Sequence, residues 1–125
     1  MTTRGAAYSG CVTQRKLFIA FTNAVDGRAD EFNEWYDNVH FPDLLAVPGV
    51  RSAQRFELAD AEVNTITPSQ HRYLVVYELD GDPTEIMGEI ARRVQAGAVV
   101  LSDAMDMTTT AMSFWSPLGP RRTAA

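Results

Sequence analysis

His40 and Tyr36 are the two side chains of this 125-residue sequence whose types and spacing best suit acid–base chemistry. They stand four residues apart in the stretch EFNEWYDNVHFPDLL, so a helix would place them one turn apart on the same face. A neutral imidazole can accept and return a proton near neutral pH. A phenol beside it can donate a hydrogen bond to a developing enolate or phenolate oxygen. The pair could therefore move protons alpha to a carbonyl, as isomerisation, dehydration or aldol cyclisation requires.

A structural role for His40 is the alternative. A histidine at the end of a helix can serve the free carbonyls of the last turn and the negative end of the helix dipole. Asp43, three residues later, could orient the imidazole or cap a short helical elbow. His71, the only other histidine, opens a predicted strand. We expect it at an exposed strand edge, with a place at the mouth of a pocket as the alternative.

Aromatic side chains could supply the walls of a pocket for a flat organic ligand, although packing in the core is the more ordinary role of each of them. The indole N–H groups of Trp35 and Trp115 need partners when buried, so we expect these two residues nearest to a ligand. Asn23, at the end of the first predicted strand, is either an amide donor to a carbonyl or a turn residue. The ligand-binding candidates are therefore Asn23, Phe32, Trp35, Tyr73 and Trp115.

Composition and motifs argue against several classes of function. The net charge of −5 argues against nucleic-acid binding, which needs a basic surface. Two histidines and scattered carboxylates do not make a dedicated transition-metal site. The sequence also lacks CxxC, HExxH, GxSxG and a glycine-rich phosphate loop. We therefore expect neither a metal nor a cofactor.

Cysteine content and hydropathy bear on the compartment. Cys11 is the only cysteine, so no disulfide can form within the chain, and a reducing compartment fits. No run approaches the roughly 18 apolar residues that a membrane span requires. We expect a cytoplasmic protein without membrane contact.

The candidate residues must be positioned by a small number of elements. The helix that carries Tyr36 and His40 is predicted to end near His40, because Pro42 biases Phe41 away from helical geometry. PDLLAVPG then makes a turn or a helical elbow. A second helix is predicted from an N-cap at Asp82 to Gly97, with Pro83 at N1 and Glu85 at N3 in a capping box. Four strands are predicted, at 17–23, 50–58, 71–79 and 108–115.

The remaining segments are predicted to be irregular. Residues 59–70 form a long polar loop and residues 98–107 an irregular return. In the strand at 50–58, alternation places Val50 with Ser52 on one face and Arg55 on the other. Arg55 could pair with Glu57 or Glu78 across strands, or bind an anion. The chain divides into an N-terminal arm at 1–15, one domain at 16–118 and a tail at 119–125.

The order β-α-β-β-α-β indicates an α+β domain with a ferredoxin-like fold, a four-stranded antiparallel sheet with two helices on one face. The first, third and fourth predicted strands carry apolar residues on both faces. The face without helices must then be covered, and pairing with a second copy would cover it. We therefore expect a homodimer formed through the sheet face.

The stretch DEFNEWYDNVHFPDLLAVPGV, followed by SAQRF, resembles the dimeric α/β-barrel superfamily and, within it, the EthD-like small proteins. The resemblance rests on an aromatic pair, a histidine four residues on, a proline and a tight turn into a strand. YLVVYEL and SDAMDMTTTAMSFW are consistent with it, and it covers residues 16 to 118. It implies that two sheets pair as a dimeric α/β barrel. It also implies a small-molecule cavity between the helices and sheet of each subunit, with His40 as its polar occupant.

Members of this superfamily include cofactor-independent isomerases, cyclases and quinol-forming monooxygenases, alongside haem-degrading enzymes. Haem degradation in related folds needs a histidine on the second helix, which this chain lacks. We first expect a cofactor-independent isomerase, cyclase or lyase that acts on a small carbonyl or phenolic compound in a catabolic or secondary-metabolic pathway. The alternatives are a non-catalytic ligand-binding or accessory dimer of an oxygenase system, and a cofactor-free quinol monooxygenase. Whether the protein is an enzyme stays open.

Overall fold

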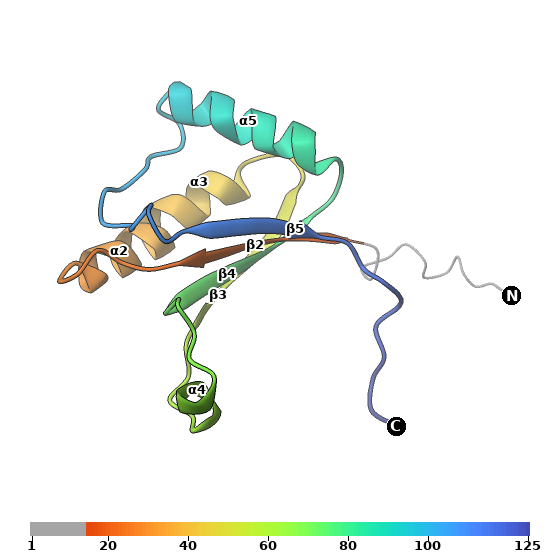
Figure 1. The fold of residues 1–125 in the computed structure, drawn as a ribbon. Helices are drawn as coiled ribbons and strands as arrows, with labels where there is room; N and C mark the ends of the chain where they lie inside the picture. The colour runs from red at the N-terminus through yellow and green to blue at the C-terminus, as the bar shows by residue number, and fades with distance from the viewer. Residues whose placement is uncertain (1–14) are drawn as a thin grey trace, which may run out of the picture.

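The structure is a computed structural model that describes residues 15–125. Cys11 and nearly all of the predicted N-terminal arm lie outside the described residues. One four-stranded sheet, in the order β3-β4-β2-β5, carries the helices α2, α3 and α5 on one face (Figure 1). Its neighbouring strands are antiparallel, which confirms the predicted ferredoxin-like α+β fold. The strands are β2 (Lys16–Thr22), β3 (Val50–Glu57), β4 (Tyr73–Leu79) and β5 (Ala111–Trp115).

The register of the sheet decides which side chains meet the helices, because successive residues of a strand point to opposite faces. β2 turns Phe18, Ala20 and Thr22 toward the helices, where all three are buried. Tyr77 of β4 pairs with Phe18 and lies on the same face. The other face, called the open face below, is formed in these two strands by Leu17, Ile19, Phe21, Leu74, Val76 and Glu78.

A bulge in β3 corrects the predicted alternation of that strand. Val50 pairs with Leu79, but Ser52 pairs with Glu78, so one extra residue lies between them. A bulge moves the following side chains to the other face. Val50 therefore joins the core, where it is 8% exposed, on the same face as Arg55. Strict alternation had placed these two residues on opposite faces.

The first helical segment is longer than predicted and contains a π turn. α2 (Ala29–Trp35) continues directly into the π-helix η2 (Tyr36–His40) and then into α3 (Phe41–Leu45). The prediction that the helix ends near His40 is wrong, since Phe41 has helical angles (φ −60°, ψ −52°). Its N–H bonds to the carbonyl of Tyr36, five residues earlier. The wider turn gives room to the ring of Pro42, which would clash with a carbonyl in a regular α-helix.

The predicted polar loop between β3 and β4 contains a short helix, α4 (Val63–Ile66). Hydrogen bonds from side chains to nearby backbone carbonyls stabilise its turns. The amide of Asn64 donates to the carbonyl of Ala59 (2.6 Å), and the hydroxyl of Thr65 donates to the carbonyl of Glu62 (2.7 Å). Figure 1 shows α4 projecting from the sheet on the side away from the other helices.

The second half of the domain follows the prediction more closely. α5 (Pro83–Gln95) begins at Asp82, whose carboxylate accepts the N–H of Thr84 at 2.9 Å. The structure shows this cap, rather than the reciprocal capping box expected with Glu85. Residues 98–110, called the 98–110 segment below, return without regular structure to β5. They are joined to the end of β2 by one bridge, between Ala24 and Met105.

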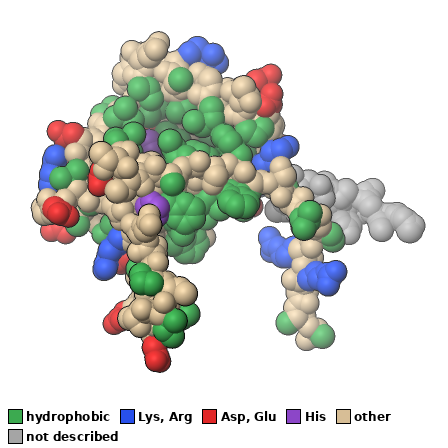
Figure 2. Space-filling view, viewed as in Figure 1, with side chains coloured by type: hydrophobic (Ala, Val, Ile, Leu, Met, Phe, Trp, Pro, Cys, Tyr) green, Lys and Arg blue, Asp and Glu red, His purple; other side chains and the backbone are tan. Residues whose placement is uncertain are grey.

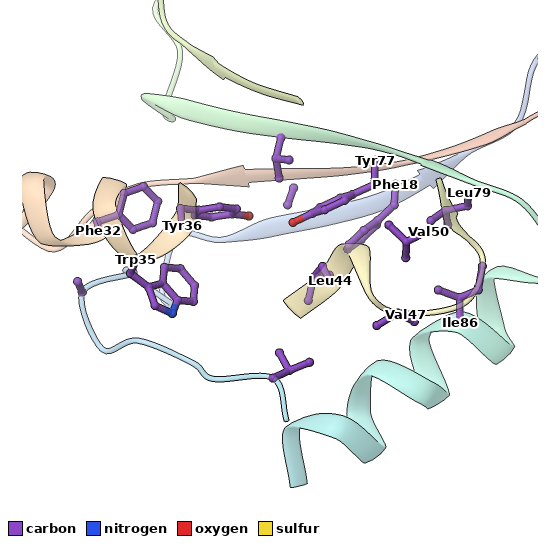
Figure 3. Close-up of a cluster of buried hydrophobic side chains, with 14 residues drawn as sticks. Phe18, Phe32, Trp35, Tyr36, Leu44, Val47, Val50, Tyr77, Leu79 and Ile86 are labelled. Atoms are coloured by element: carbon purple, nitrogen blue, oxygen red, sulfur yellow. The ribbon is translucent and has the colours of Figure 1, made fainter. Parts of the chain in front are cut away.

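The hydrophobic core lies between the sheet and the helices (Figure 3). Its largest fully buried side chains are Tyr77, Phe32, Val47 and Val75. Aromatic rings dominate one end, where Phe32 meets Tyr36 edge-on at a centroid distance of 5.5 Å. Aliphatic residues of β3, β4 and α5 fill the other end. The core therefore changes from aromatic to aliphatic along the sheet.

Two kinds of feature are absent from residues 15–125. No helix there has the length and apolar character needed to cross a bilayer. The longest, α5, has 13 residues and carries four charged side chains. The same residues contain no group of three or more histidine, cysteine, aspartate or glutamate side chains placed to hold a metal ion.

Candidate functional site

A cavity of about 180 Å³ lies between the helix-covered face of the sheet, α5 and the 98–110 segment. Figure 2 shows hydrophobic side chains gathered around a recess below α5, with histidine atoms visible among them. Buried residues such as Phe18 and Ala20 form its floor. Its mouth is formed by side chains that are more than half exposed, namely Leu101 (59%), Met107 (63%) and Met112 (56%).

The chemical character of the lining restricts what the cavity can hold. No aspartate, glutamate, lysine or arginine lines it. An unpaired charge taken out of water into apolar surroundings is strongly unfavourable. The cavity therefore suits an uncharged ligand. Its polar side chains are Thr22, Tyr36, His40, Tyr77 and Thr110.

His40 and Tyr36 both line this cavity, and the π turn determines how they meet. Their rings are 5.0 Å apart between centroids and stand nearly perpendicular, at 86°. Trp35 stacks on the imidazole, with centroids 4.6 Å apart and 25° between the planes, and its ring lies 5.1 Å from that of Tyr36. The imidazole therefore packs against an indole and a phenol that also contact each other.

His40 is uncharged at neutral pH. Its Nδ1 is buried and has no hydrogen-bond partner among the described residues. Burial lowers the pKa of His40 from 6.5 to about 4, and the carboxylate of Asp43 opposes this shift only in part. A neutral imidazole has one free lone pair and one N–H, so it can accept a proton or donate a hydrogen bond. The ring is thus available for chemistry or for ligand binding.

Two un-ionised phenols face each other across the same cavity. Figure 3 shows the hydroxyls of Tyr36 and Tyr77 pointing toward one another. Burial is the main cause that raises the pKa of both residues, and each phenol also acts on the pKa of the other. The two hydroxyls lie close together, since a side-chain contact between them contributes to both pKa shifts, but their geometry leaves the buried hydroxyl of Tyr77 without a well-formed hydrogen bond among the described residues. Both hydroxyls therefore stay protonated and can donate at neutral pH.

Arg55 supports Tyr36 from the side away from the cavity. Its guanidinium lies 4.7 Å from the ring centroid of Tyr36, within the range of a cation–π contact. It also donates to Asp37 (3.0 Å) and Asn33 (2.6 Å). The predicted pairing of Arg55 with Glu57 or Glu78 is wrong. The bulge and the helix above the strand turn Arg55 into the aromatic cluster instead.

The backbone of Val100, which belongs to the 98–110 segment, forms hydrogen bonds with the side chains of Trp35 and Asp43. Its carbonyl accepts the indole N–H of Trp35 at 2.9 Å, and its N–H donates to the carboxylate of Asp43 at 3.0 Å. Of the two roles expected for Asp43, the structure shows neither a bond to the imidazole nor a helix cap. Asp43 instead holds the segment that closes one side of the cavity.

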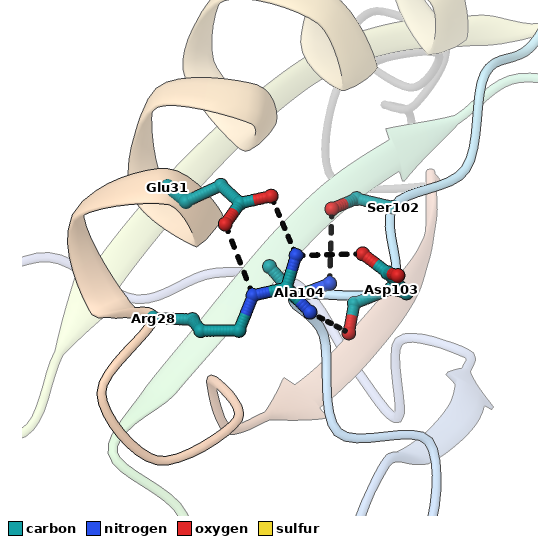
Figure 4. A network of polar contacts seen from close by, with 5 residues as sticks. All are labelled: Arg28, Glu31, Ser102, Asp103 and Ala104. Carbon is teal, nitrogen blue, oxygen red and sulfur yellow. Dashed lines mark hydrogen bonds and ion pairs between the residues drawn. The ribbon is translucent and has the colours of Figure 1, made fainter.

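A second anchor fixes the same segment further along (Figure 4). The guanidinium of Arg28 donates to the carboxylate of Asp103 at 2.7 Å and to its carbonyl at 3.1 Å. It also pairs with Glu31 at 2.6 Å. The N–H of Ala104 donates to the hydroxyl of Ser102 at 3.1 Å, which shapes the turn. Together these contacts hold the 98–110 segment against the start of α2.

The ligand-binding candidates other than the catalytic pair do not line the cavity. Phe32 is fully buried in the core, and Tyr73 packs against it at a centroid distance of 5.3 Å. Trp35 reaches the site only through its stack on His40. Trp115 pairs with Leu17 and lies on the open face, where it is 55% exposed. The structure therefore separates Trp115 from His40 by the thickness of the sheet.

Asn23 and His71 have structural partners at one end of the sheet. The amide of Asn23 donates to Gln70 (3.0 Å) and Thr109 (3.1 Å) and accepts the N–H of Arg72 (2.8 Å). Nε2 of His71 lies 2.7 Å from the carbonyl of Thr109. These bonds join the β3–β4 connection to the 98–110 segment. The turn role considered for Asn23 fits this arrangement better than contact with a ligand.

Sequence reasoning missed several residues of the site. Tyr77 was not among the predicted site residues, although the alternation in YLVVYEL places it on the buried face of β4. The sequence pattern did not indicate that the methionines belong to the site, because three of them lie in the 98–110 segment or next to it. Every methionine of the described residues lines the cavity, namely Met87, Met105, Met107 and Met112. Flexible thioethers adapt to irregular ligands.

Comparison with known proteins supports the fold. No family model matches the sequence, and no curated protein matches it either. The crystal structure of an EthD family protein from Bacillus halodurans C-125 has a TM-score of 0.55 and 16% identity over 80% of this chain and 95% of that chain. The crystal structure of HapK from Hahella chejuensis has a TM-score of 0.56 and 17% identity over 88% of this chain and 99% of that chain. This chain therefore has the small α+β fold of EthD-like proteins.

Proposed function

We propose that the protein is a cofactor-independent enzyme that moves protons on a small, uncharged carbonyl or phenolic compound. One observation carries the proposal. A neutral imidazole and two protonated phenols meet in the wall of an otherwise apolar cavity with an exposed mouth. Convergent polar groups in an apolar pocket, with shifted pKa values, are typical of an active site.

The geometry suits abstraction of a proton next to a carbonyl. His40 would take the proton from the carbon alpha to the carbonyl and become an imidazolium, leaving the electron pair as an enolate. The hydroxyl of Tyr36, whose ring lies 5.0 Å from the imidazole, would donate a hydrogen bond to the enolate oxygen. His40 would then return the proton to the same carbon or to a conjugated one. The second outcome is an isomerisation, with atoms and charge balanced and no other reactant.

Exchange of alpha protons with solvent tests this proposal without knowledge of the natural substrate. Cyclohexanone in D₂O would be followed by proton NMR with the wild-type protein, His40→Gln and Tyr36→Phe. We expect exchange above the buffer rate that falls to background in His40→Gln and by roughly 10²-fold in Tyr36→Phe. His71→Gln is the matched control and should keep the wild-type rate. Equal exchange in wild type and His40→Gln would contradict the proposal.

One observation favours a second candidate, a non-catalytic protein that binds a small ligand. A pKa of about 4 makes His40 a weak base, whereas an efficient general base has a pKa near the working pH. In that case His40 would serve as a hydrogen-bonding group for the ligand. The same NMR samples separate the two candidates. Ligand-induced shifts without alpha-proton exchange in any of a panel of small ketones would favour the binding protein.

A further inference from the structure

The buried hydroxyl of Tyr77 indicates what kind of ligand the cavity can bind. The residue is only 1% exposed, yet its hydroxyl has no hydrogen-bond partner among the described residues. A buried hydroxyl left without a partner loses its hydration without compensation, so such groups normally have one. The hydroxyl lies in the cavity wall and points toward Tyr36 (Figure 3). Its missing partner would therefore come from whatever occupies the cavity.

We propose that the cavity binds an uncharged, single-ring compound whose oxygen is held between the hydroxyls of Tyr77 and Tyr36. This deepens the proposed function and rests on it for the claim of catalysis, but not for the claim of binding. A phenol or a cyclic ketone has the required oxygen. A phenol can donate to one hydroxyl and accept from the other, whereas a ketone accepts from both.

The size of the cavity limits the ligand to one ring. Its volume of about 180 Å³ is close to the roughly 150 Å³ of an apolar protein cavity that binds benzene. It is below the roughly 300 Å³ at which pockets for larger, drug-sized ligands begin. The methionines at the mouth, Met107 and Met112, can move to admit a substituent but do not enlarge the floor.

Charge limits the ligand further. The lining has no basic side chain that could pair with a carboxylate. Arg55, the nearest guanidinium to Tyr36, lies against the ring and is already bonded to Asp37 and Asn33. A carboxylate in the cavity would thus lose its hydration without gaining a partner. Benzoate, which matches phenol in ring size, should be excluded.

A ligand-by-variant cycle tests this proposal by calorimetry at pH 7. Phenol, toluene and benzoate would each be titrated into the wild-type protein, Tyr77→Phe and Tyr73→Phe. We expect phenol to bind the wild type at least tenfold more tightly than benzoate. Tyr77→Phe should weaken phenol roughly five- to tenfold while leaving toluene unchanged. Tyr73→Phe, which removes a hydroxyl outside the cavity, should leave both affinities unchanged.

Three results would overturn the proposal. They are benzoate binding as tightly as phenol, no phenol binding by the wild type, and equal effects of Tyr77→Phe on phenol and toluene. Removal of an unpartnered hydroxyl should not impair folding, and thermal unfolding of each variant checks this. Binding is measured without turnover, so the two proposals can fail separately. Phenol binding without alpha-proton exchange contradicts only the enzymatic proposal. Alpha-proton exchange that is insensitive to Tyr77→Phe contradicts only the proposal that Tyr77 binds the ligand oxygen.

Discussion

The indole of Trp35 stacks on the imidazole of His40 at a centroid distance of 4.6 Å while its N–H bonds to the carbonyl of Val100 at 2.9 Å. One side chain thus contacts the candidate base and holds the segment that covers it. His40 and the 98–110 segment are therefore coupled through Trp35. The coupling can be tested by removing the hydrogen bond and keeping an aromatic ring.

Trp35→Phe should lower the free energy of unfolding by about 1–3 kcal/mol, because it removes a buried hydrogen bond and part of the core. Amide exchange at residues 98–101 should accelerate. Chemical denaturation and hydrogen exchange measure the two effects. Trp115→Phe is the matched control, since within residues 15–125 its indole N–H bonds only to Ser113 on an exposed strand. Equal effects of both substitutions would show that Trp35 has no special role in holding the segment.

The pH dependence of stability should report the burial of His40. Its pKa is about 4 in the folded protein and near 6.5 when unfolded. The unfolded chain therefore binds more protons between these values, so stability is complete above pH 6.5 and is lost as the pH falls toward 4. Between pH 7.5 and 5 the wild type should lose about 2 kcal/mol more than His40→Gln does. Urea denaturation at both pH values measures this difference. An equal loss of stability in the two proteins would show that the pKa of His40 is not lowered by folding.

Arg55 should be needed for the integrity of the aromatic end of the core. Arg55→Met keeps much of the side-chain length but leaves Asp37 and Asn33 without their shared donor and removes the contact with Tyr36. We expect a loss of about 1–3 kcal/mol in the free energy of unfolding. Arg51→Met, at an exposed position of the same strand, should change it by less than about 0.5 kcal/mol. An unchanged free energy of unfolding in Arg55→Met would show that the guanidinium contributes little to stability.

Gly49 should tolerate no side chain. It has a φ of +95°, and a Cβ there would lie 2.7 Å from Cδ1 of Ile86 and 3.0 Å from the carbonyl of Asp80. Gly97 has a similar φ of +80° but open space around it. Gly97→Ala should therefore lower the free energy of unfolding by about 1 kcal/mol through backbone strain alone, and Gly49→Ala should lower it clearly more. Thermal melts of the two variants would test this, and equal melting temperatures would exclude the steric effect.

The homodimer remains a prediction that the single chain leaves open. The open face presents partly buried Ile19 and Val76 in the centre of the sheet. If a second copy covers this face, Val76→Lys should convert a dimer into a monomer, because an unpaired charge would be buried in the interface. Glu85→Lys on exposed α5 is the control. Light scattering would detect the change, and a wild-type monomer at micromolar concentration would contradict the prediction.

The sequence predicted the fold well because periodicity is a local signal. YLVVYEL alternates over β4, and Asp82 with Pro83 begins α5 as its residue types suggest. The π turn could not be read in the same way. The rule that a residue before proline avoids helical geometry was overridden at Phe41, because packing against the sheet continues the helix and the wider turn accommodates the ring.

The site was only partly predictable because it is assembled from distant segments. His40 and Tyr36 could be found from their spacing on one helix. Tyr77 reaches the same cavity through sheet register, and Met105 through the irregular 98–110 segment, neither of which periodicity specifies. Trp115 was expected near the ligand, but its register opposite Leu17 turns it to the open face.

NMR of the histidine side chains can show whether His40 is uncharged and lies beside a ligand in the cavity. The 13Cε1 resonances of His40 and His71 would be followed from pH 7.5 to 4.5, first without and then with saturating phenol. We predict that His40 remains neutral down to about pH 5 and that its resonance shifts on addition of phenol, while that of His71 does not. A His40 ring that titrates near pH 6.5 and does not respond to phenol would instead show that the imidazole lies in water rather than in a cavity that receives a ligand.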